Sequence, residues 1–325
     1  MASLPPRRTY QTKRGHALSF IHIPARDPSL STLLFLHGFP SQLHDWTKQI
    51  NFFSERGFAL VAPDLLGFGG SSKPSDASQY RFRPMSDDLV GLLNHLEIHG
   101  DTVVGIGHDL GAMLLSRMAT YHPDRLSKLI FISVGPARMG SPFNVQEIND
   151  MTRKMLGYEL LGYISWIAGE DTGAQQELEA HAESAMSLMF CADQTLWDEW
   201  FRPLGKMEQF VSEDRRVAVG SWYTDELRKH HLDAYSREHG YRGVVCWYRM
   251  MMKNLFMEDE AGYEGFVLDQ PTLLITDTSP GGGQQESFLG AWAKEIKTVK
   301  IDGGHLLHLE KADETNEAIL DFLTR

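Results

Sequence analysis

An aspartate lies at the centre of the stretch GIGHDLG, residues 105–111. Gly107 and Gly111 lie two residues before and two residues after Asp109. This is the spacing of a sharp strand-to-helix turn that presents its central side chain at the carboxyl ends of the strands, usually as serine. A carboxylate there can attack an sp3 carbon and form an ester with an alcohol. The stretch predicts a carboxylate nucleophile, the alternative being a helix-capping aspartate in an ordinary turn.

Two further stretches supply partners for this aspartate. The motif HGFP (residues 37–40) follows an apolar run, where enzymes with such a turn place a second N–H donor for an oxyanion. His305 follows the last apolar run, so the chain order is nucleophile first and histidine last. His305 is the candidate general base for activating water. The backbone N–H groups of Phe39 and Leu110 are the candidate oxyanion hole.

The elements that must position these residues follow an alternating pattern. Strands are predicted within residues 16–23, 31–40, 58–72, 102–108, 126–134, 271–277 and 291–302. Helices are predicted over residues 44–57, 86–100 (opened by Ser86), 110–122 and 312–323. Residues 137–260 show mostly helical spacing instead. We expect an α/β protein with a mostly parallel sheet flanked by helices, its core formed by residues 1–136 and 261–325 and interrupted by a helical cap over 137–260.

The combination of HGFP, DLLGFGGSS, GHDLG and GGH with a helical insertion resembles the α/β-hydrolase fold. Within that superfamily, the aspartate and the HGFP motif are similar to those of the soluble epoxide hydrolases. The resemblance covers nearly the whole chain, but these motifs are shared with dehalogenases that use the same nucleophile. It implies conversion of an epoxide to a vicinal diol through a covalent aspartyl ester, with no cofactor and no metal.

In the epoxide hydrolase family, paired tyrosines of the cap polarise the epoxide oxygen. The stretch RGVVCWYRMMM (242–252) resembles the family's RGxxxWYR segment and implies Tyr248 as one of the pair. The stretch YISWIAGED is similar to the segment that carries the other tyrosine and implies Tyr163, with Tyr158 as the alternative. Amphipathic packing with a wet hydroxyl is the other interpretation of such rings.

The family's third acidic residue, which orients the histidine, has no direct counterpart. Alignment of PTLLITDTSP with the family's strand and loop puts Pro280 at the usual aspartate position. Asp277, three residues earlier, is the candidate that we adopt, and Glu286 is the alternative. The other position that such hydrolases use, after the strand at 126–134, offers Ser133 and Gly135 but no acid.

Two other functions compete with epoxide hydrolysis. Dehalogenation needs halide donors or arginines that hold a substrate carboxylate, and the positions after the nucleophile are Leu110 and Met113. Trp166 or Trp247 could substitute as a halide donor. A ligand-binding scaffold with little turnover is the alternative of a different class. The predicted lining of the substrate pocket comprises His37, Pro40, His108, Trp166 and Trp247.

Composition excludes several classes of protein. The chain has 325 residues, 42% hydrophobic, and a net charge of -12, which argues against a broad nucleic-acid-binding surface. Two isolated cysteines form no disulfide framework, and no run of 18 apolar residues predicts a membrane span. We expect a cytoplasmic enzyme acting on a small apolar epoxide and water, without a nucleic-acid partner; the sequence leaves its oligomeric state open.

Overall fold

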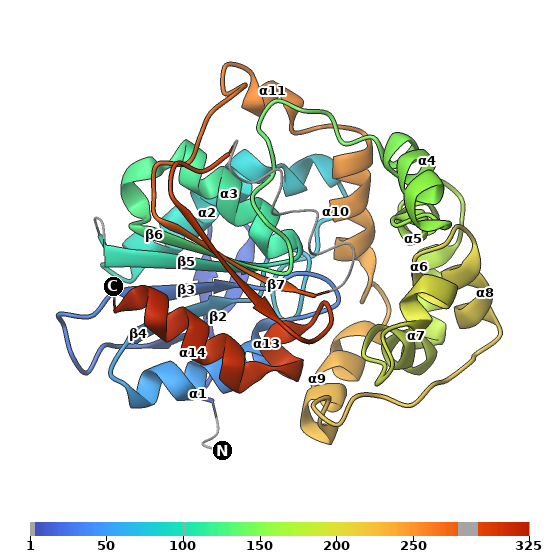
Figure 1. The fold of residues 1–325 in the computed structure, drawn as a ribbon, viewed down its shortest axis with the longest axis horizontal. Helices are drawn as coiled ribbons and strands as arrows, with labels where there is room; N and C mark the ends of the chain where they lie inside the picture. Colours follow the sequence, from blue (N-terminus) through green and yellow to red (C-terminus); the bar gives the residue numbers. More distant parts are fainter. Residues whose placement is uncertain (1–3, 100–101, 279–291, 325) are drawn as a thin grey trace. The chain divides into compact units, whose positions relative to one another are not determined.

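The computed structural model describes residues 4–99, 102–278 and 292–324 (Figure 1). The chain forms two compact units. The sheet unit comprises Met1–Ser72, Phe82–Ser141 and Asp259–Arg325, and the helical unit comprises Lys73–Arg81 and Pro142–Glu258. Residues 73–81 were predicted to belong to the core. They belong to the helical unit because the ring of Tyr80 packs against Trp247, with the ring centroids 6.4 Å apart.

The sheet unit is built on eight strands in the order β1-β2-β4-β3-β5-β6-β7-β8. In this sheet β2 runs antiparallel to its two neighbours, β1 and β4, and the remaining pairs are parallel. The central strands are buried along their whole length, as expected for parallel strands covered on both faces. The strands are β1 (Arg8–Gln11), β2 (Ala17–Ile23), β3 (Thr32–Leu36), β4 (Ala59–Pro63), β5 (Val103–His108), β6 (Lys128–Ile132), β7 (Thr272–Asp277) and β8 (Ile296–Ile301).

Helices cover both faces of this sheet (Figure 1). On one face, α1 and α14 contribute Phe53 and Ile319 to an apolar core shared with the strands. On the other face lie α2 and α3, of which α3 matches its prediction to within one residue and α2 does not. The helices of the sheet unit are α1 (Thr47–Glu55), α2 (Phe82–His95), α3 (Leu110–Tyr121), α13 (Leu307–Glu310) and α14 (Ala312–Leu323).

The helix α2 was predicted over residues 86–100 from Ser86, but it runs from Phe82 to His95, so both predicted ends were wrong. The helix begins at Phe82, and Ser86 lies inside it with its hydroxyl donating to the carbonyl of Phe82 at 2.8 Å. A serine can satisfy its hydroxyl one turn back in a helix as well as at an N-cap, so its presence alone does not fix the first residue.

The helical unit contains the remaining long helices. Their side chains enclose a core of large residues, in which Phe190 stacks on Tyr223 with ring centroids 4.1 Å apart. The helices are α4 (Val145–Leu156), α5 (Gly162–Ile167), α6 (Ala174–Ala180), α7 (Ala182–Met189), α8 (Lys206–Ser212), α9 (Asp225–Tyr235) and α10 (Arg242–Met252). The short α11 (Met257–Glu260) crosses back to the sheet unit.

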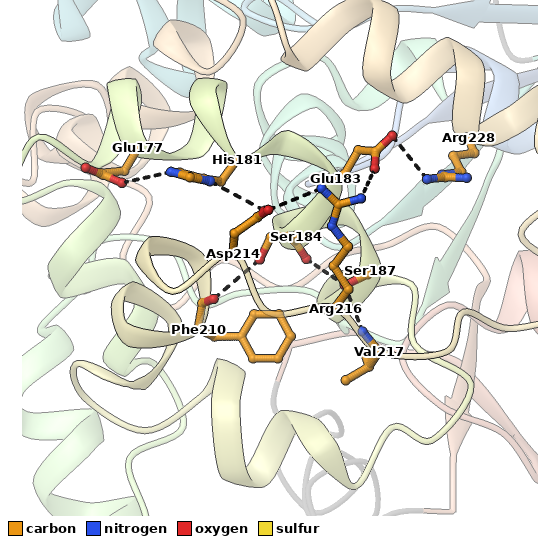
Figure 2. A network of polar contacts seen from close by, with 10 residues as sticks. All are labelled: Glu177, His181, Glu183, Ser184, Ser187, Phe210, Asp214, Arg216, Val217 and Arg228. Carbon is orange, nitrogen blue, oxygen red and sulfur yellow. Dashed lines mark hydrogen bonds and ion pairs between the residues drawn. The ribbon is translucent and has the colours of Figure 1, made fainter.

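A chain of charged side chains joins several of these helices (Figure 2). His181 Nδ1 lies 3.5 Å from Asp214 Oδ1, and Arg216 Nη2 lies 3.3 Å from Asp214 Oδ2. Arg216 also pairs with Glu183, which in turn accepts from Arg228 at 3.2 Å. Their side chains are between 32% and 54% exposed, so water screens each pair to about 1 kcal/mol or less. The aromatic core therefore stabilises the helical unit more than this network does.

One ion pair of the sheet unit is fully buried. Arg117 on α3 donates from Nε to Glu260 Oε1 at 2.8 Å, and the two side chains are 3% and 0% exposed. The second oxygen of Glu260 accepts the N–H of Gly140 at 2.7 Å. Gly140 and Glu260 lie next to two of the four points where the chain passes between the units, so these contacts fix the chain at both of those points to α3.

Replacing Glu260 by glutamine should destabilise the protein strongly. The change is isosteric but leaves the charge of Arg117 buried without compensation, which typically costs about 3–5 kcal/mol. Equilibrium urea unfolding measures the change. Lys229→Met breaks an exposed pair on α9 and serves as the control, with an expected change below about 0.5 kcal/mol. Equal effects of the two substitutions would contradict the importance of the buried pair.

Candidate active site

Asp109 occupies the turn between β5 and α3 with a φ of 53° and a ψ of -120°. A positive φ is costly for any residue that carries a Cβ. The neighbouring backbone holds the turn closely: a Cβ on Gly107 would lie 2.8 Å from the Cα of Ala112, and one on Gly111 would overlap the carbonyl oxygen of Leu36. The predicted strand–turn–helix is therefore present, and both flanking glycines are required by close packing.

The HGFP loop lies directly beside the carboxylate. The N–H of Phe39 donates to Asp109 Oδ1 at 2.9 Å. A Cβ on Gly38 would overlap the same oxygen and lie 2.7 Å from the nitrogen of Leu110. Only glycine at that position leaves room for an oxygen next to the backbone nitrogens of Phe39 and Leu110, the two predicted oxyanion donors.

His37 supports this loop from within the fold. Its Nε2 accepts the N–H of Leu65 at 3.0 Å, so the proton is on Nδ1, which donates to the carbonyl of Gly38 at 2.9 Å. Both ring nitrogens are thus used by the backbone, and the ring is buried. The predicted pocket residue Pro40 follows in the same loop, joined to Phe39 by a cis peptide bond.

His305 lies on the other side of the carboxylate. Its Nε2 is 3.4 Å from Asp109 Oδ2, and the two side chains are 20% and 17% exposed. The loop that carries His305 follows β8 and is held by the N–H of Gly304, which donates to Glu310 Oε2 at 2.8 Å. The structure therefore brings together the predicted nucleophile, base and oxyanion donor, which are far apart in the chain.

The surroundings of Asp109 favour its ionised form. Burial by itself would raise the pKa of this carboxyl group. The hydrogen bond and charge of His305, the nearby His108 and the N–H of Phe39 outweigh burial, so that the pKa lies below its ordinary value of 3.8. The carboxylate is then negatively charged at neutral pH, as a nucleophile must be.

His108, predicted to line the pocket, is instead fully buried. Its ring lies 4.7 Å from that of His305 and 4.4 Å from that of His308, centroid to centroid. Burial, and then the neighbouring His305, lower its pKa to about 4, so the ring is neutral at pH 7. Burial also lowers the pKa of His308. The ring of His108 thus packs against the ring of His305 and also against that of His308.

Acidification below pH 6.5 should destabilise the sheet unit. In the unfolded chain His108 binds a proton near its ordinary pKa of 6.5, whereas in the fold its pKa is about 4. Between these values the unfolded state binds more protons, so the free energy of unfolding falls as the pH falls, by on the order of 3 kcal/mol for this ring. Urea unfolding at pH 7 and pH 4.5 measures the loss, which His108→Gln should reduce. A free energy that does not change over this interval would contradict the prediction.

Asp277, the predicted orienting acid, is the last residue of β7 and is buried. It is paired in register with Ile301, the last residue of β8, four residues before His305. Its role stays a prediction. Pro280 and Glu286 lie outside the described residues.

Within the helical unit, the structure brings Tyr163 and Tyr248 together. Their rings meet edge to face, with centroids 5.8 Å apart. Tyr163 also stacks on Phe201 at 4.4 Å. The alternative, Tyr158, lies beside Asp198; burial and a hydrogen bond to that carboxylate raise its pKa. The pairing with Tyr248 favours Tyr163 over Tyr158.

Arg249, which was not among the predicted site residues, helps to keep these two tyrosines together. Its guanidinium donates to the carbonyls of Ala168 and Gly169 at 3.0 and 2.9 Å, beyond the last turn of α5. Arg249 follows Tyr248 on α10, so it fixes α10 against the helix that carries Tyr163. The only sequence signal was its place within the WYR motif.

The two tryptophans predicted for the pocket lie in the interior of the helical unit. Trp247 is fully buried against Tyr80, and Trp166 is buried on α5. Among the described residues, no group of three or more histidine, cysteine or acidic side chains is placed to hold a metal ion. None of the described helices is long and apolar enough to cross a membrane.

Fold and site together define an α/β hydrolase whose strand-to-helix turn carries aspartate. The family model described as "alpha/beta hydrolase fold" matches residues 31–312. Epoxide hydrolase 1 of Siraitia grosvenorii is 30% identical over 306 residues, 90% of this chain and 91% of that relative. Epoxide hydrolase A of Mycobacterium tuberculosis is 27% identical over 312 residues, 93% of each chain. The crystal structure of epoxide hydrolase A from Mycobacterium thermoresistibile superposes with a TM-score of 0.80 at 26% identity, covering 98% of both chains.

The chain therefore belongs to the α/β-hydrolase fold family and, within it, to the epoxide hydrolases.

Proposed function

We propose that this protein hydrolyses an epoxide to a vicinal diol through an ester on Asp109. The observation that supports it most directly is the arrangement of the carboxylate: Oδ1 accepts the N–H of Phe39, and Oδ2 faces His305. One oxygen is thus held by a donor suited to an oxyanion, and the other remains for attack on the substrate. The likeness to epoxide hydrolases named above supports the choice of substrate.

In the first step, Oδ2 of Asp109 attacks a ring carbon of the epoxide. The carbon–oxygen bond of the ring breaks and its electron pair goes to the ring oxygen. That oxygen becomes a strongly basic alkoxide, which we propose takes a proton from Tyr248, with Tyr163 as the second hydrogen-bond donor. The product is a hydroxyalkyl ester of Asp109.

In the second step, His305 removes a proton from water, and the hydroxide attacks the carboxyl carbon of Asp109. Negative charge then forms on Oδ1, next to the N–H groups of Phe39 and Leu110. When this intermediate collapses, the diol oxygen leaves and takes the proton from His305. The proton of the new carboxylic acid restores the tyrosine, so that epoxide and water are consumed and only diol is formed. We propose that Asp277 stabilises the charged His305 during this step.

The residues after the nucleophile favour a small apolar epoxide. Leu110 and Met113 occupy the positions at which arginines would bind the carboxylate of a haloacid. Cys191 and Cys246 are free and buried, which favours the cytoplasm as the location that we propose. No metal or cofactor takes part in either step.

The proposal is tested by intact mass of the His305→Gln variant after exposure to a panel of epoxides and haloacids. Without the base the ester should accumulate, adding the mass of one whole epoxide on a peptide that contains Asp109. His239→Gln, an exposed histidine of the helical unit, is the control and should accumulate no ester. A mass increase equal to that of a haloacid without its halide would instead identify a dehalogenase. A folded variant that forms no adduct would favour a ligand-binding scaffold.

The tyrosine pair makes a separate prediction. Tyr248→Phe and Tyr163→Phe should each slow formation of the ester by about 100-fold, since each loses one donor to the ring oxygen, whereas Tyr158→Phe should change it by less than about twofold. Single-turnover quench experiments measure the rate of ester formation. A larger loss for Tyr158→Phe than for Tyr163→Phe would exchange the two assignments.

A further inference from the structure

We infer that Ser133 is a positioning residue for His305: its hydroxyl holds the backbone carbonyl of the histidine and so fixes the base for hydrolysis of the ester. The inference rests on the proposed function and extends it to a residue whose position offered no acid in the sequence. Ser133 Oγ donates to the carbonyl oxygen of His305 at 2.6 Å, although 172 residues separate the two.

The conformation of Ser133 serves this contact. Ser133 directly follows β6, is 2% exposed and has a φ of 63°. A residue other than glycine pays a cost for this conformation, of about 1–3 kcal/mol in general. Its N–H donates to the carbonyl of Ile275 on β7 at 2.8 Å, which keeps the turn against the sheet. The backbone is therefore fixed in the orientation that directs the hydroxyl at His305.

A second donor holds the same carbonyl. His108 Nε2 lies 2.9 Å from the carbonyl oxygen of His305, and because a carbonyl only accepts, this nitrogen carries the proton. His108 is the last residue of β5 and is paired in register with Ile132, the residue before Ser133. One carbonyl oxygen thus receives donors from two neighbouring strands.

This arrangement ties the base to the nucleophile. His108 is the last residue of β5 and immediately precedes Asp109. The hydrogen bond from His108 therefore holds the backbone of His305 at a fixed distance from the strand that leads into the nucleophile. The separation to be maintained is the 3.4 Å between His305 Nε2 and Asp109 Oδ2. These hydrogen bonds fix the backbone of His305, whereas an acidic residue would orient its ring, so the two effects add to each other. A displacement of about 1 Å at a reacting group can lower a rate by about 100-fold.

The two chemical steps separate this role from a general structural one. Attack by Asp109 on the epoxide needs no base, whereas hydrolysis of the ester needs His305. Loss of the Ser133 hydroxyl should therefore slow hydrolysis and leave ester formation unchanged. In steady state kcat and KM should fall together, while kcat/KM stays at the value of the unmodified enzyme.

The experiment compares Ser133→Ala and Ser133→Gly with the unmodified full-length protein, using an epoxide that gives the ester in the His305→Gln variant. Both variants lose the hydroxyl, but glycine adopts the positive φ without strain, so Ser133→Gly keeps the fold while removing the contact. We expect hydrolysis of the ester to slow by about tenfold in each, since the donor from His108 remains. Intact mass during turnover should show the ester accumulating.

Ser86→Ala is the matched control. It also removes a buried hydroxyl that donates to a backbone carbonyl at 2.8 Å, but on α2 and within one helix. Hydrolysis at the unmodified rate in both Ser133 variants would overturn the inference and leave the proposed function intact. Equal losses in kcat and kcat/KM, or an equal effect of Ser86→Ala, would also overturn it. Absence of any adduct in His305→Gln would reject the proposed function itself, and the inference with it.

Discussion

The site depends on one backbone constraint, the positive φ at Asp109. An aspartate with a φ of 53° is held there because the chain before and after it has no room to relax. Gly107 and Gly111 let two other backbone segments approach within contact distance, and Gly38 lets the HGFP loop reach the carboxylate. This close approach places the N–H of Phe39 beside the carboxylate. The strain is thus maintained by close packing among β5, the end of β3 with its following loop, and the start of α3.

The electrostatics follow from that placement. The carboxylate is partly buried, which by itself opposes its charge, and its hydrogen bonds to Phe39 and His305 reverse the outcome. The rings of His108 and His308 are buried more deeply and remain neutral, so the only histidine of this cluster with access to solvent is the one that faces the carboxylate. The difference in burial therefore gives two histidines in contact different roles: His108 is neutral and supports the site, and His305 is the proposed base.

Each unit contains its own means of fixing the side chains proposed for catalysis. In the sheet unit, the register of β5, β6 and β7 brings the ends of three strands to the loop of His305. In the helical unit, Arg249 joins α10 to the end of α5 and so keeps the two tyrosine rings in contact. In both cases the fixing group acts on a backbone carbonyl, which leaves the catalytic side chain itself available for substrate.

The sequence by itself determined the features that depend on local periodicity and spacing. Short apolar runs that alternate with helical segments predicted the parallel strands, and the glycine spacing predicted the turn at Asp109. The last helix was predicted with its first and last residues correct, 312 and 323. The strand β1 was missed because its residues are mostly exposed and show no apolar pattern, and the first turn of α2 was missed because a serine suits more than one position.

Only the tertiary structure decided the roles of Ser133, Arg249 and Glu260. These side chains bind backbone groups or charged groups that are far away in the chain. Every residue has a backbone carbonyl, so no sequence pattern shows which carbonyl a side chain will bind.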